Sequence, residues 1–495
     1  MEEFVRLIPL ICKYFNADEI DAKIYDHSFT IVDGCKLLMV KIKNEKIIIL
    51  IGKGKMFDEL EGKEIFNCKL CWLNHHNRLV FNKYMDYTVP KAFGKKVATI
   101  GLGDRLGLAS SAHIKTIQNR KVKPILAQQS KRELDLTGRT YDDVLDDVCY
   151  AVIQEGYKNG FGADGDHLKD ECDIKRALDA GFSMITLDCF DKIDNSIESY
   201  EMDDLLKMYY QLPLDMRRYY EDNYAGKEYL IGNRPIMFDK ESLIKNILIY
   251  GKVIDFIEYI YKKYIQCAGR EVDFEISLDE TAFPTSLHGH YLVASELELR
   301  NVDISSMAPR FVGEFQKGID YIGDVEQFEE NFKLHAQIAN HFGYKLSIHS
   351  GSDKFSVFGI IGKHTGGRLH IKTSGTNWLE AVRLIAKKNP SLYRRMHKYA
   401  LKHFDEARKY YHVTTDLSAI KDIDSLEDRE LDSYMNDNNA RQLMHITYGI
   451  LLNAEEDSAN LFKDEIFNTL SEFEDEYHKY IFSHINRHLD SLCLD

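Results

Sequence analysis

The amino-acid sequence predicts an α/β protein built on a (β/α)8 barrel of the TIM type, with a small N-terminal α+β domain and a helical C-terminal extension. Between residues 96 and 390, short apolar segments alternate with amphipathic helical segments. Eight such apolar segments occur, which is the number of strands that closes a barrel. The chain on either side lacks this alternation. An open, doubly wound sheet would show the same alternation and is the alternative fold.

The N-terminal α+β domain is predicted to span residues 1–95 and to contain an antiparallel sheet. Strand candidates at residues 28–32 and 37–40 flank Asp33-Gly34, a dipeptide that favours a tight hairpin turn. A third candidate spans residues 46–51. No residue pattern in this domain indicates a catalytic function.

The catalytic barrel is predicted to span residues 96–390, and residues 391–495, which have no strand pattern, are predicted to form a helical extension packed on it. The segment from about 190 to 267 is too long for a single crossover and is rich in tyrosine, so we expect a helical insertion that covers the site. The predicted barrel strands lie at residues 97–102, 122–127, 160–163, 183–187, 272–278, 302–306, 345–348 and 369–373.

Composition and charge narrow the classes of function. A chain of 495 residues with 44% hydrophobic and 29% charged residues is globular, and its net charge of -15 disfavours binding to nucleic acid or to an anionic membrane. The nine cysteines form no framework, and the N-terminus is a poor signal peptide because charged residues interrupt its apolar positions. No apolar run is long enough to span a membrane. We therefore expect a cytoplasmic protein.

Polar side chains gather where the predicted strands end, which is where barrel enzymes place their active sites. Gly160–Lys169, Ser347–Phe355 and His370–Thr376 all combine glycines with side chains that bind metals or move protons. Any single residue of this kind could be a loop cap, but the set predicts a polar small-molecule site. Its members include Asp104, Arg105, Gln128, Gln129, Ser130, Arg132, Asp166, His167, Asp188, Glu275, Ser277, Asp279, Glu280, Arg310, His349, Ser350, Ser352, Asp353, Lys354, His370, Lys372, Thr373 and Ser374.

Histidines at separate strand ends are how a barrel assembles an open metal site. His167 and His349 are the best candidates, and His290 is the third, with His288 and His370 as competitors for that place. The glycine run at residues 101, 103 and 107 does not fit the dinucleotide fingerprint, which disfavours NAD.

Six long motifs carry a resemblance to a known family. They are GFGADGDHLK at 160–169, AGFSMITLD at 180–188, EISLDET at 275–281, APRFVGEFQKGIDYIGD at 308–324, KLSIHSGSDKF at 345–355 and HIKTSGTNWLEA at 370–381. In these motifs the chain resembles the bacterial tagaturonate/fructuronate epimerases, from about residue 101 to residue 390. The resemblance implies a metal-dependent epimerase of hexuronate catabolism that interconverts D-tagaturonate and D-fructuronate.

The resemblance also implies roles for particular residues. Asp166 and a glutamate of the EISLDET motif, Glu275 with Glu280 as the alternative, would be the acid–base pair. The ligands of a divalent cation (Zn, Mn, Co or Ni) would be His167, His290 and His349. The residues expected to bind the substrate are Gln129, Arg310, Ser352, Lys354 and Lys372, with Arg310 and Lys354 on its carboxylate.

The carbon to be inverted lies two bonds from the ketone, so simple enolisation does not make its hydrogen acidic. We expect retro-aldol cleavage and re-addition, because transient oxidation would need NAD. The alternatives are a metal-dependent aldolase or lyase, a 4-epimerase of neutral ketoses, and a sugar-acid binding protein without turnover.

Overall fold

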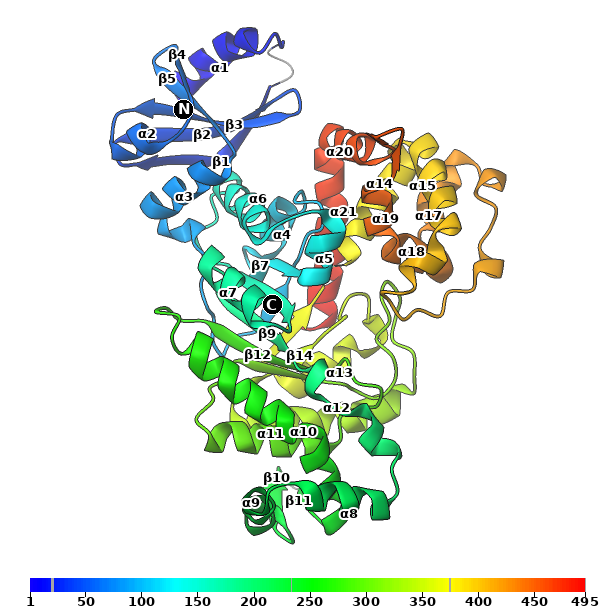
Figure 1. Cartoon of the computed structure of the whole chain (residues 1–495). Helices are drawn as coiled ribbons and strands as arrows, with labels where there is room; N and C mark the ends of the chain where they lie inside the picture. The colour runs from blue at the N-terminus through cyan, green and yellow to red at the C-terminus, as the bar shows by residue number, and fades with distance from the viewer. Residues whose placement is uncertain (19–21, 233, 374, 495) are drawn as a thin grey trace.

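A closed barrel of parallel strands lies at the centre of the computed structural model, which describes residues 1–18, 22–232, 234–373 and 375–494 (Figure 1). Within these residues eight strands pair in the ring order β12-β13-β14-β15-β6-β7-β8-β9, and β9 pairs with β12 to close it. The predicted fold class is confirmed. The strands are β6 (Thr99–Gly101), β7 (Lys123–Ser130), β8 (Gly162–Leu168), β9 (Met184–Asp188), β12 (Asp273–Leu278), β13 (Ser306–Pro309), β14 (Lys345–Ile348) and β15 (Leu369–Lys372).

Helices surround this barrel because each strand is buried on both faces and needs apolar cover. Local signals set their ends: Thr140 and Asp143 form a capping box before α6, and Gly181 ends α7 in the left-handed region. The covering helices are α4 (Ser110–Ile117), α5 (Lys131–Thr137), α6 (Tyr141–Gln154), α7 (Glu171–Ala180), α10 (Lys240–Ile260), α11 (Leu287–Leu299), α12 (Val325–Phe342), α13 (Phe355–Thr365) and α14 (Thr376–Lys388).

Two barrel strands differ from their predicted bounds in a way that affects the site. Strand β8 continues to Leu168, so Asp166 and His167 belong to the strand and not to the loop after it. Its pairing with β9 shifts register between Gly165 and Leu168, and His167 has a φ of 55°. This irregularity is a bulge that redirects the side chain of His167. Strand β13 begins at Ser306, where the predicted strand ended.

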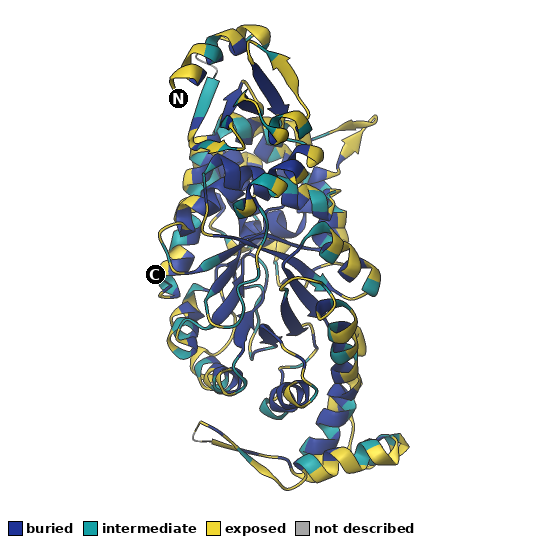
Figure 2. Ribbon diagram, turned by 90° about the vertical axis from the view of Figure 1, so that its left-hand side faces the viewer, coloured by how far each residue is buried: buried dark blue, intermediate teal, exposed yellow. Residues whose placement is uncertain are grey.

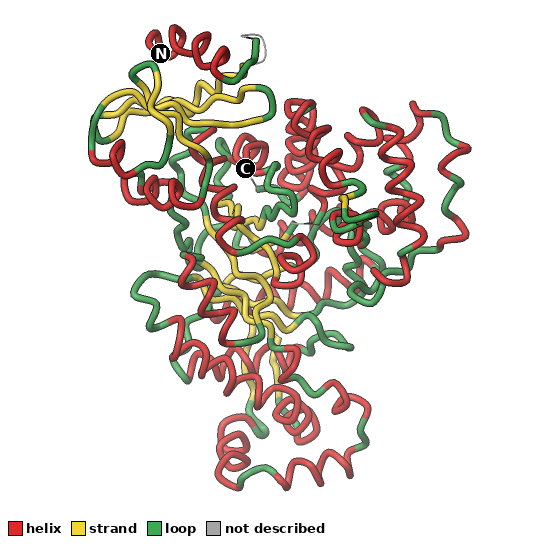
Figure 3. Tube along the Cα trace, turned by 45° about the horizontal axis from the view of Figure 1, so that its top comes forward, coloured by secondary structure: helices red, strands yellow, loops and turns green. Residues whose placement is uncertain are grey.

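The N-terminal residues form an antiparallel sheet in the order β1-β2-β3-β5-β4, separate from the barrel strands (Figure 3). The turn between β1 and β2 is at Asp33-Gly34, both with positive φ, as a two-residue hairpin requires. The elements are α1 (Glu2–Tyr14), β1 (Ala22–Val32), β2 (Cys35–Ile42), β3 (Glu45–Gly52), α2 (Lys55–Glu59), β4 (Lys63–Ile65), β5 (Cys68–Trp72), α3 (His75–Tyr84) and η2 (Asp86–Thr88).

The insertion after β9 forms an arm that projects from the barrel and is largely exposed at its tip (Figure 2). The two cavities at the barrel mouth have no lining residue from this arm, so the expectation that it covers the site was wrong. Before α10 it contains η3 (Phe190–Lys192), η4 (Asn195–Ser199), α8 (Met202–Gln211), α9 (Leu214–Tyr224), β10 (Glu228–Ile231) and β11 (Arg234–Met237), and the short helix η5 (Tyr261–Ile265) follows α10.

The C-terminal residues form helices that pack on the barrel, with α21 lying against α4, α13 and α14. A two-strand hairpin interrupts them, which the sequence pattern did not indicate. No helix within the described ranges is long and apolar enough to cross a membrane. The elements are α15 (Pro390–Lys402), α16 (Phe404–Ala407), η6 (Leu417–Ala419), η7 (Ile423–Ser425), η8 (Asp428–Glu430), α17 (Leu431–Tyr434), α18 (Asn438–Ile446), α19 (Tyr448–Leu452), β16 (Glu455–Glu456), β17 (Ala459–Asn460), α20 (Lys463–Glu472) and α21 (Glu474–Ser491).

Glu474 at the start of α21 joins the N-terminal sheet to the C-terminal helices. Its carboxylate accepts a hydrogen bond from Tyr25 at 2.9 Å and lies 2.9 Å from Lys46 Nζ and 3.3 Å from Lys41 Nζ. Glu474→Gln leaves these lysines without their counter-ion, so we expect the free energy of unfolding at pH 7 to fall by about 2–4 kcal/mol. Asp475→Asn is the matched control, because Asp475 and its partner Lys23 are exposed and should contribute little.

The pH dependence follows from the same contacts. Burial favours the neutral acid, but Lys46 and Lys41 outweigh it and hold the pKa of Glu474 well below its usual value. A lowered carboxyl pKa stabilises the fold above the pKa of the unfolded chain, and this stabilisation is lost as the pH falls. We therefore expect urea unfolding between pH 7 and pH 3 to show that the difference in the free energy of unfolding between wild type and Glu474→Gln becomes smaller below about pH 4. If this difference in the free energy of unfolding stays constant with pH, the stabilising role of these charges is contradicted.

Candidate active site

A polar cavity of about 700 Å³ opens at the carboxyl ends of the barrel strands. This is the end of the barrel at which enzymes of this architecture place their active sites. The cavity is lined by Gln128, Ser130, Arg132, Glu133, Asp166, His167, Asp279, Glu280, Lys317, Gly318, His349, Ser350, Ser352, Lys372, Gly375, Tyr411 and His445. Ser374, a member of the predicted strand-end set, lies outside the described residues.

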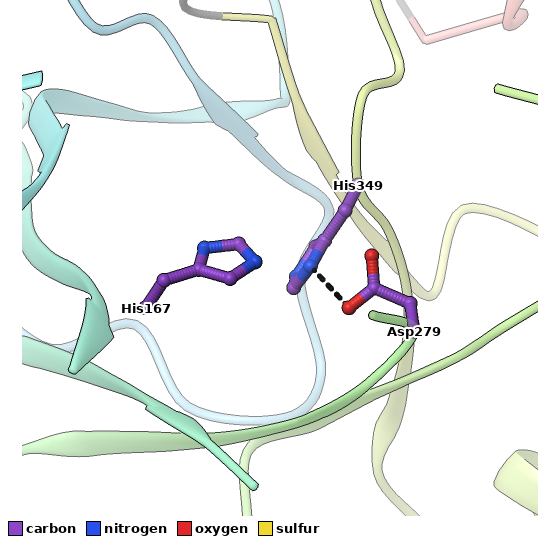
Figure 4. A group of neighbouring side chains, drawn as sticks. All are labelled: His167, Asp279 and His349. Carbon is purple, nitrogen blue, oxygen red and sulfur yellow. Dashed lines mark hydrogen bonds and ion pairs between the residues drawn. The ribbon is translucent and has the colours of Figure 1, made fainter. Parts of the chain in front are cut away.

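Three side chains in this cavity form a group that could hold a metal ion (Figure 4). One ligand atom from each of His167, Asp279 and His349 lies within 4.8 Å of the other two. His167 comes from β8, Asp279 follows β12 directly, and His349 follows β14 directly. The Nδ1 atom of His349 is 2.9 Å from Asp279 Oδ1. Two histidines and a carboxylate are a common ligand set for a divalent metal.

A carboxylate lies behind each of these histidines. Asp166 Oδ1 is 2.7 Å from Nδ1 of His167, and Glu275 Oε1 is 2.8 Å from Nε2 of His349. In protein metal sites such a carboxylate fixes the tautomer and the orientation of the ligand histidine. This arrangement leaves Nε2 of His167 and Nδ1 of His349 as the ligand atoms.

Lys372, the last residue of β15, connects both carboxylates. Its Nζ lies 2.5 Å from Asp166, 2.9 Å from Glu275 and 2.9 Å from Asp164, and it also donates to Thr186. This one lysine therefore bridges β8 and β12 across the interior of the barrel.

The charges around the histidines fit a bound cation. Burial disfavours a charged imidazole, but the Asp166 carboxylate outweighs it and raises the pKa of His167 to about 10. The pKa of His349 is also raised, because Asp279 and Glu275 outweigh its burial. The buried carboxylates Asp164, Asp166 and Glu275 have Lys372 as their only lysine or arginine partner within ion-pair distance among the described residues, and the half-buried Asp279 has none there. A divalent cation would supply the missing positive charge.

His290, the predicted third ligand, does not lie in this group. It is fully buried in α11, where Nδ1 is 2.8 Å from His335 and Nε2 is 2.6 Å from the hydroxyl of Tyr344. His370 points into the barrel with Nδ1 bonded to Thr99, and His288 bonds the carbonyl of Met237. The structure brings Asp279 to the position for which the sequence analysis chose His290. Asp279 was among the polar strand-end residues but was not chosen as a ligand.

Glu275, predicted as one of the acid–base pair, has no exposed surface and does not line the cavity. Its second oxygen accepts from Ser306 at 2.5 Å. Glu280, the alternative, lines the cavity and has no hydrogen-bond or ion-pair partner in the described part of the chain. Asp166 lines the cavity as expected, with Oδ2 accepting from Gln128 at 2.8 Å. Gln129 lies outside it, bonded to the carbonyl of Asp104.

Lys354 and Arg310, the two residues expected to hold the substrate carboxylate, donate hydrogen bonds to backbone carbonyl groups instead. Lys354 Nζ is fully buried and donates to the carbonyls of Gln316, Ile319 and Ser352 at 2.8, 2.6 and 2.8 Å. The left-handed conformation of Asp353 (φ 60°) precedes it. A second cavity adjoins the first and shares seven lining residues with it: Arg132, Asp279, Glu280, Lys317, His349, Ser350 and Tyr411. We call the first the inner cavity and the second the outer cavity. Arg310 donates to the carbonyl of Thr281 and lines only the outer cavity, whereas Ser352 and Lys372 line the inner one. Lys354 therefore supports the β14–α13 loop.

The C-terminal extension closes the cavity, which the sequence analysis did not predict. Tyr411 and His445 come from this extension and line the cavity. The ring of His445 lies so close to Gly375 that a Cβ there would be 2.4 Å from its Cε1. The missing side chain of this glycine lets the ring of His445 approach the barrel this closely.

A second group, Asp353, His484 and His488, also has ligand-type atoms close together. Here His488 Nε2 accepts from the backbone N–H of Asp353 at 2.9 Å, and Arg441 pairs with Asp353 at 2.7 Å. The Nε2 lone pair of His488 and the carboxylate charge of Asp353 are therefore already engaged within the protein. This group links α21 to the β14–α13 loop.

The fold and this cavity define a (β/α)8-barrel enzyme with a polar site of histidines, carboxylates and lysines at the barrel mouth. The sequence profile of the tagaturonate epimerase family (UxaE) matches residues 25–492. The chain therefore belongs to the tagaturonate epimerase family, and an epimerase is an isomerase.

Individual relatives agree with this assignment. A protein of Thermotoga maritima named tagaturonate/fructuronate epimerase is 39% identical over 475 residues, which is 95% of this chain and 97% of that protein. The glycerol-bound crystal structure of the fructuronate-tagaturonate epimerase UxaE of Cohnella laeviribosi has 54% identity and a TM-score of 0.96, and covers 99% of this chain and 100% of that one. The native structure of the same enzyme has 56% identity and a TM-score of 0.95, with 96% and 97% covered.

Proposed function

We propose that the protein interconverts D-tagaturonate and D-fructuronate by retro-aldol cleavage and re-addition in the cavity at the barrel mouth. Membership of the family and the names of its relatives support the substrate. The observation that carries the proposal is the convergence of His167, Asp279 and His349 on a cavity that Asp166 and Glu280 also line. The exposed thiols of Cys172, Cys267 and Cys493 fit a reducing, cytoplasmic compartment.

His167, Asp279 and His349 are the residues that would hold the metal. Their donor set and the surplus of buried carboxylates around them both fit a divalent cation. When bound, the cation polarises the ketone and stabilises the negative charge that develops on its oxygen.

Proton transfer falls to the carboxylates that reach the cavity. Glu280 has no hydrogen-bond or ion-pair partner among the described residues, so it is free to accept the proton of the carbinol hydroxyl. Asp166 is hydrogen-bonded to the ammonium of Lys372 and can exchange a proton with the substrate beside it. Glu275 would act as a positioning residue, because it does not line the cavity and its carboxylate contacts His349, Lys372, Thr186 and Ser306.

The bond changes balance without a redox cofactor. As Glu280 removes the hydroxyl proton, that oxygen becomes the carbonyl of an aldehyde. The bond between the carbinol carbon and the carbon next to the ketone breaks, and its electron pair forms an enediolate. The aldehyde then turns, the bond re-forms on its other face, and the proton returns.

A direct test is NMR of purified protein, loaded with divalent metal, during incubation with D-fructuronate. Appearance of D-tagaturonate without fragments supports the proposal. Net accumulation of three-carbon fragments would identify a lyase, and binding without turnover would identify a sugar-acid binding protein.

The position of the carboxylates predicts different results for Glu275 and Glu280, which lie five residues apart. Glu280→Gln removes the proton acceptor in the cavity, so kcat should fall by about 100- to 10,000-fold while the metal content stays unchanged. Glu275→Gln should lower metal affinity by roughly 10- to 100-fold, because it weakens the orientation of His349. Metal analysis and kinetics on both variants check this. Normal turnover by Glu280→Gln would contradict the assignment of Glu280 as proton acceptor and would favour Glu275, as predicted from the sequence.

A further inference from the structure

Two cations at the inner cavity have no carboxylate partner within ion-pair distance among the residues that the structure describes. They are Arg132 on α5 and Lys317 in the loop between β13 and α12, and both line the inner and the outer cavity. In a chain with a net charge of -15, positive charges without a partner beside a pocket need an explanation.

Arg132 is held by the C-terminal extension and is otherwise unused. Its guanidinium lies 4.7 Å from the ring centre of Tyr411, and Nη1 donates to the carbonyl of Tyr410 at 3.3 Å. Its Nε is buried and has no hydrogen-bond partner among the described residues. The stacking and the backbone contact fix the planar guanidinium and leave donors free.

Lys317 is half-buried, and its Nζ makes no hydrogen bond or ion pair within the described ranges. Burial and the like charge of Arg132 lower the pKa of its ammonium group. The two side chains are therefore close enough to repel each other, and an anion between them would relieve this repulsion.

The other cations around the cavities are occupied. Lys372 is surrounded by three carboxylates, Lys354 and Arg310 bond backbone carbonyls, and Arg105 pairs with Glu133 at 2.7 Å. His445 is kept neutral by burial and by Arg105, which lower its pKa well below the usual range. Glu133 and Glu280 are the acids that face this wall, and Arg105 already neutralises the first.

The two sides of the inner cavity therefore carry different charged groups. One side carries the histidines and carboxylates around Lys372, and the other carries Arg132 and Lys317. A ketose acid has a matching division, since its ketone needs the first side and its carboxylate lies at the far end of the carbon chain.

We propose that Arg132 and Lys317 together bind the carboxylate of the substrate and make the enzyme select sugar acids over neutral ketoses. The proposal rests on the proposed function and identifies the group that distinguishes the substrate class. Because both residues also line the outer cavity, which has a volume of about 940 Å³, they meet the anion as it enters.

The test measures binding, so it does not depend on turnover. The ligand is D-mannonate, in which an alcohol replaces the ketone of D-fructuronate, and its neutral counterpart is D-mannitol. Calorimetry on metal-loaded wild type, Arg132→Gln and Lys317→Met gives the Kd of each. We expect each substitution to raise the Kd of D-mannonate about tenfold to a hundredfold, the effect of losing one charge-assisted hydrogen bond. The preference for D-mannonate over D-mannitol should fall by the same factor.

Lys131→Met is the matched control, because Lys131 precedes Arg132, pairs with Asp135 on the exposed face of α5 and lines neither cavity. It removes the same charge and should change the Kd by less than about twofold. Lys317→Arg should retain the preference for the acid. Wild-type binding of D-mannonate by Lys317→Met, or equal losses for the acid and the neutral ligand, would overturn the proposal. Failure of the proposed function would appear separately, as intact acid selectivity without conversion of D-fructuronate.

Discussion

His349→Ala is expected to lose the bound divalent cation and nearly all turnover together. His349 offers Nδ1 beside Asp279 and is oriented by Glu275 through Nε2. Loss of a ligand from a site with three protein ligands leaves two, which hold a cation poorly. A catalytic metal supplies several kcal/mol of transition-state stabilisation, so kcat/KM should fall roughly a thousandfold or more.

Metal analysis of the purified variant, with D-fructuronate kinetics at saturating metal, measures both effects. His290→Ala is the informative comparison, because His290 lies in α11 and bonds His335 and Tyr344. It should keep its metal and lose thermal stability. Full metal occupancy in His349→Ala would remove His349 from the ligand set, and loss of metal in His290→Ala would restore the histidine trio of the sequence prediction.

Lys372→Met is expected to destabilise the fold and abolish turnover while keeping the metal. The lysine is nearly buried and is the shared partner of Asp164, Asp166 and Glu275. Removing one partner from a buried ion-pair network typically costs about 3–5 kcal/mol, because the remaining charges are left uncompensated. The carboxylates freed from Lys372 should attract a divalent cation more strongly, so metal affinity should hold or rise.

Lys345→Met is the matched control from the adjacent strand β14. Lys345 is equally buried, but within the described part of the chain its Nζ has only the hydroxyl of Thr99, at 3.0 Å, as a hydrogen-bond or ion-pair partner, and burial lowers its pKa. Replacing a buried charge that has no counter-ion should leave stability unchanged or raise it. Urea unfolding of both variants and metal titration decide the matter. Equal destabilisation by the two substitutions would mean that the volume of the buried lysine matters, and not its charge.

Several site residues could be predicted because the barrel rule assigns strand ends to the active site without needing side-chain positions. His167 and His349 follow from this rule, as does the location of Asp166 and Lys372. The rule does not say which strand-end side chains face one another. Asp279 and Glu275 both belong to the β12 segment, yet Glu275 is enclosed in the barrel and Asp279 reaches the cavity.

Other differences from the sequence prediction also have causes in particular contacts. His290 was expected at a strand end, but Ser286 caps α11 just before it, and the helix directs its ring toward α12. Lys354 was expected to face the substrate, but carbonyl groups of the β13–α12 loop surround its ammonium. Arg132 belonged to the strand-end set without a role, because its significance depends on Tyr411, which lies 279 positions further along the chain.

The sequence by itself determined the eight-stranded barrel, the family and the two histidines at the ends of β8 and β14. Periodicity and strand-end position are local properties, and they are written in consecutive residues. Only the tertiary structure decided the third ligand-type side chain, the partners of Lys372 and the cations that remain free for a substrate. Those assignments depend on which distant segments approach, such as the C-terminal extension against Gly375, and on which charges are already neutralised by a neighbour. Neither the approach of distant segments nor the pairing of charges can be predicted from the spacing of residues along the chain.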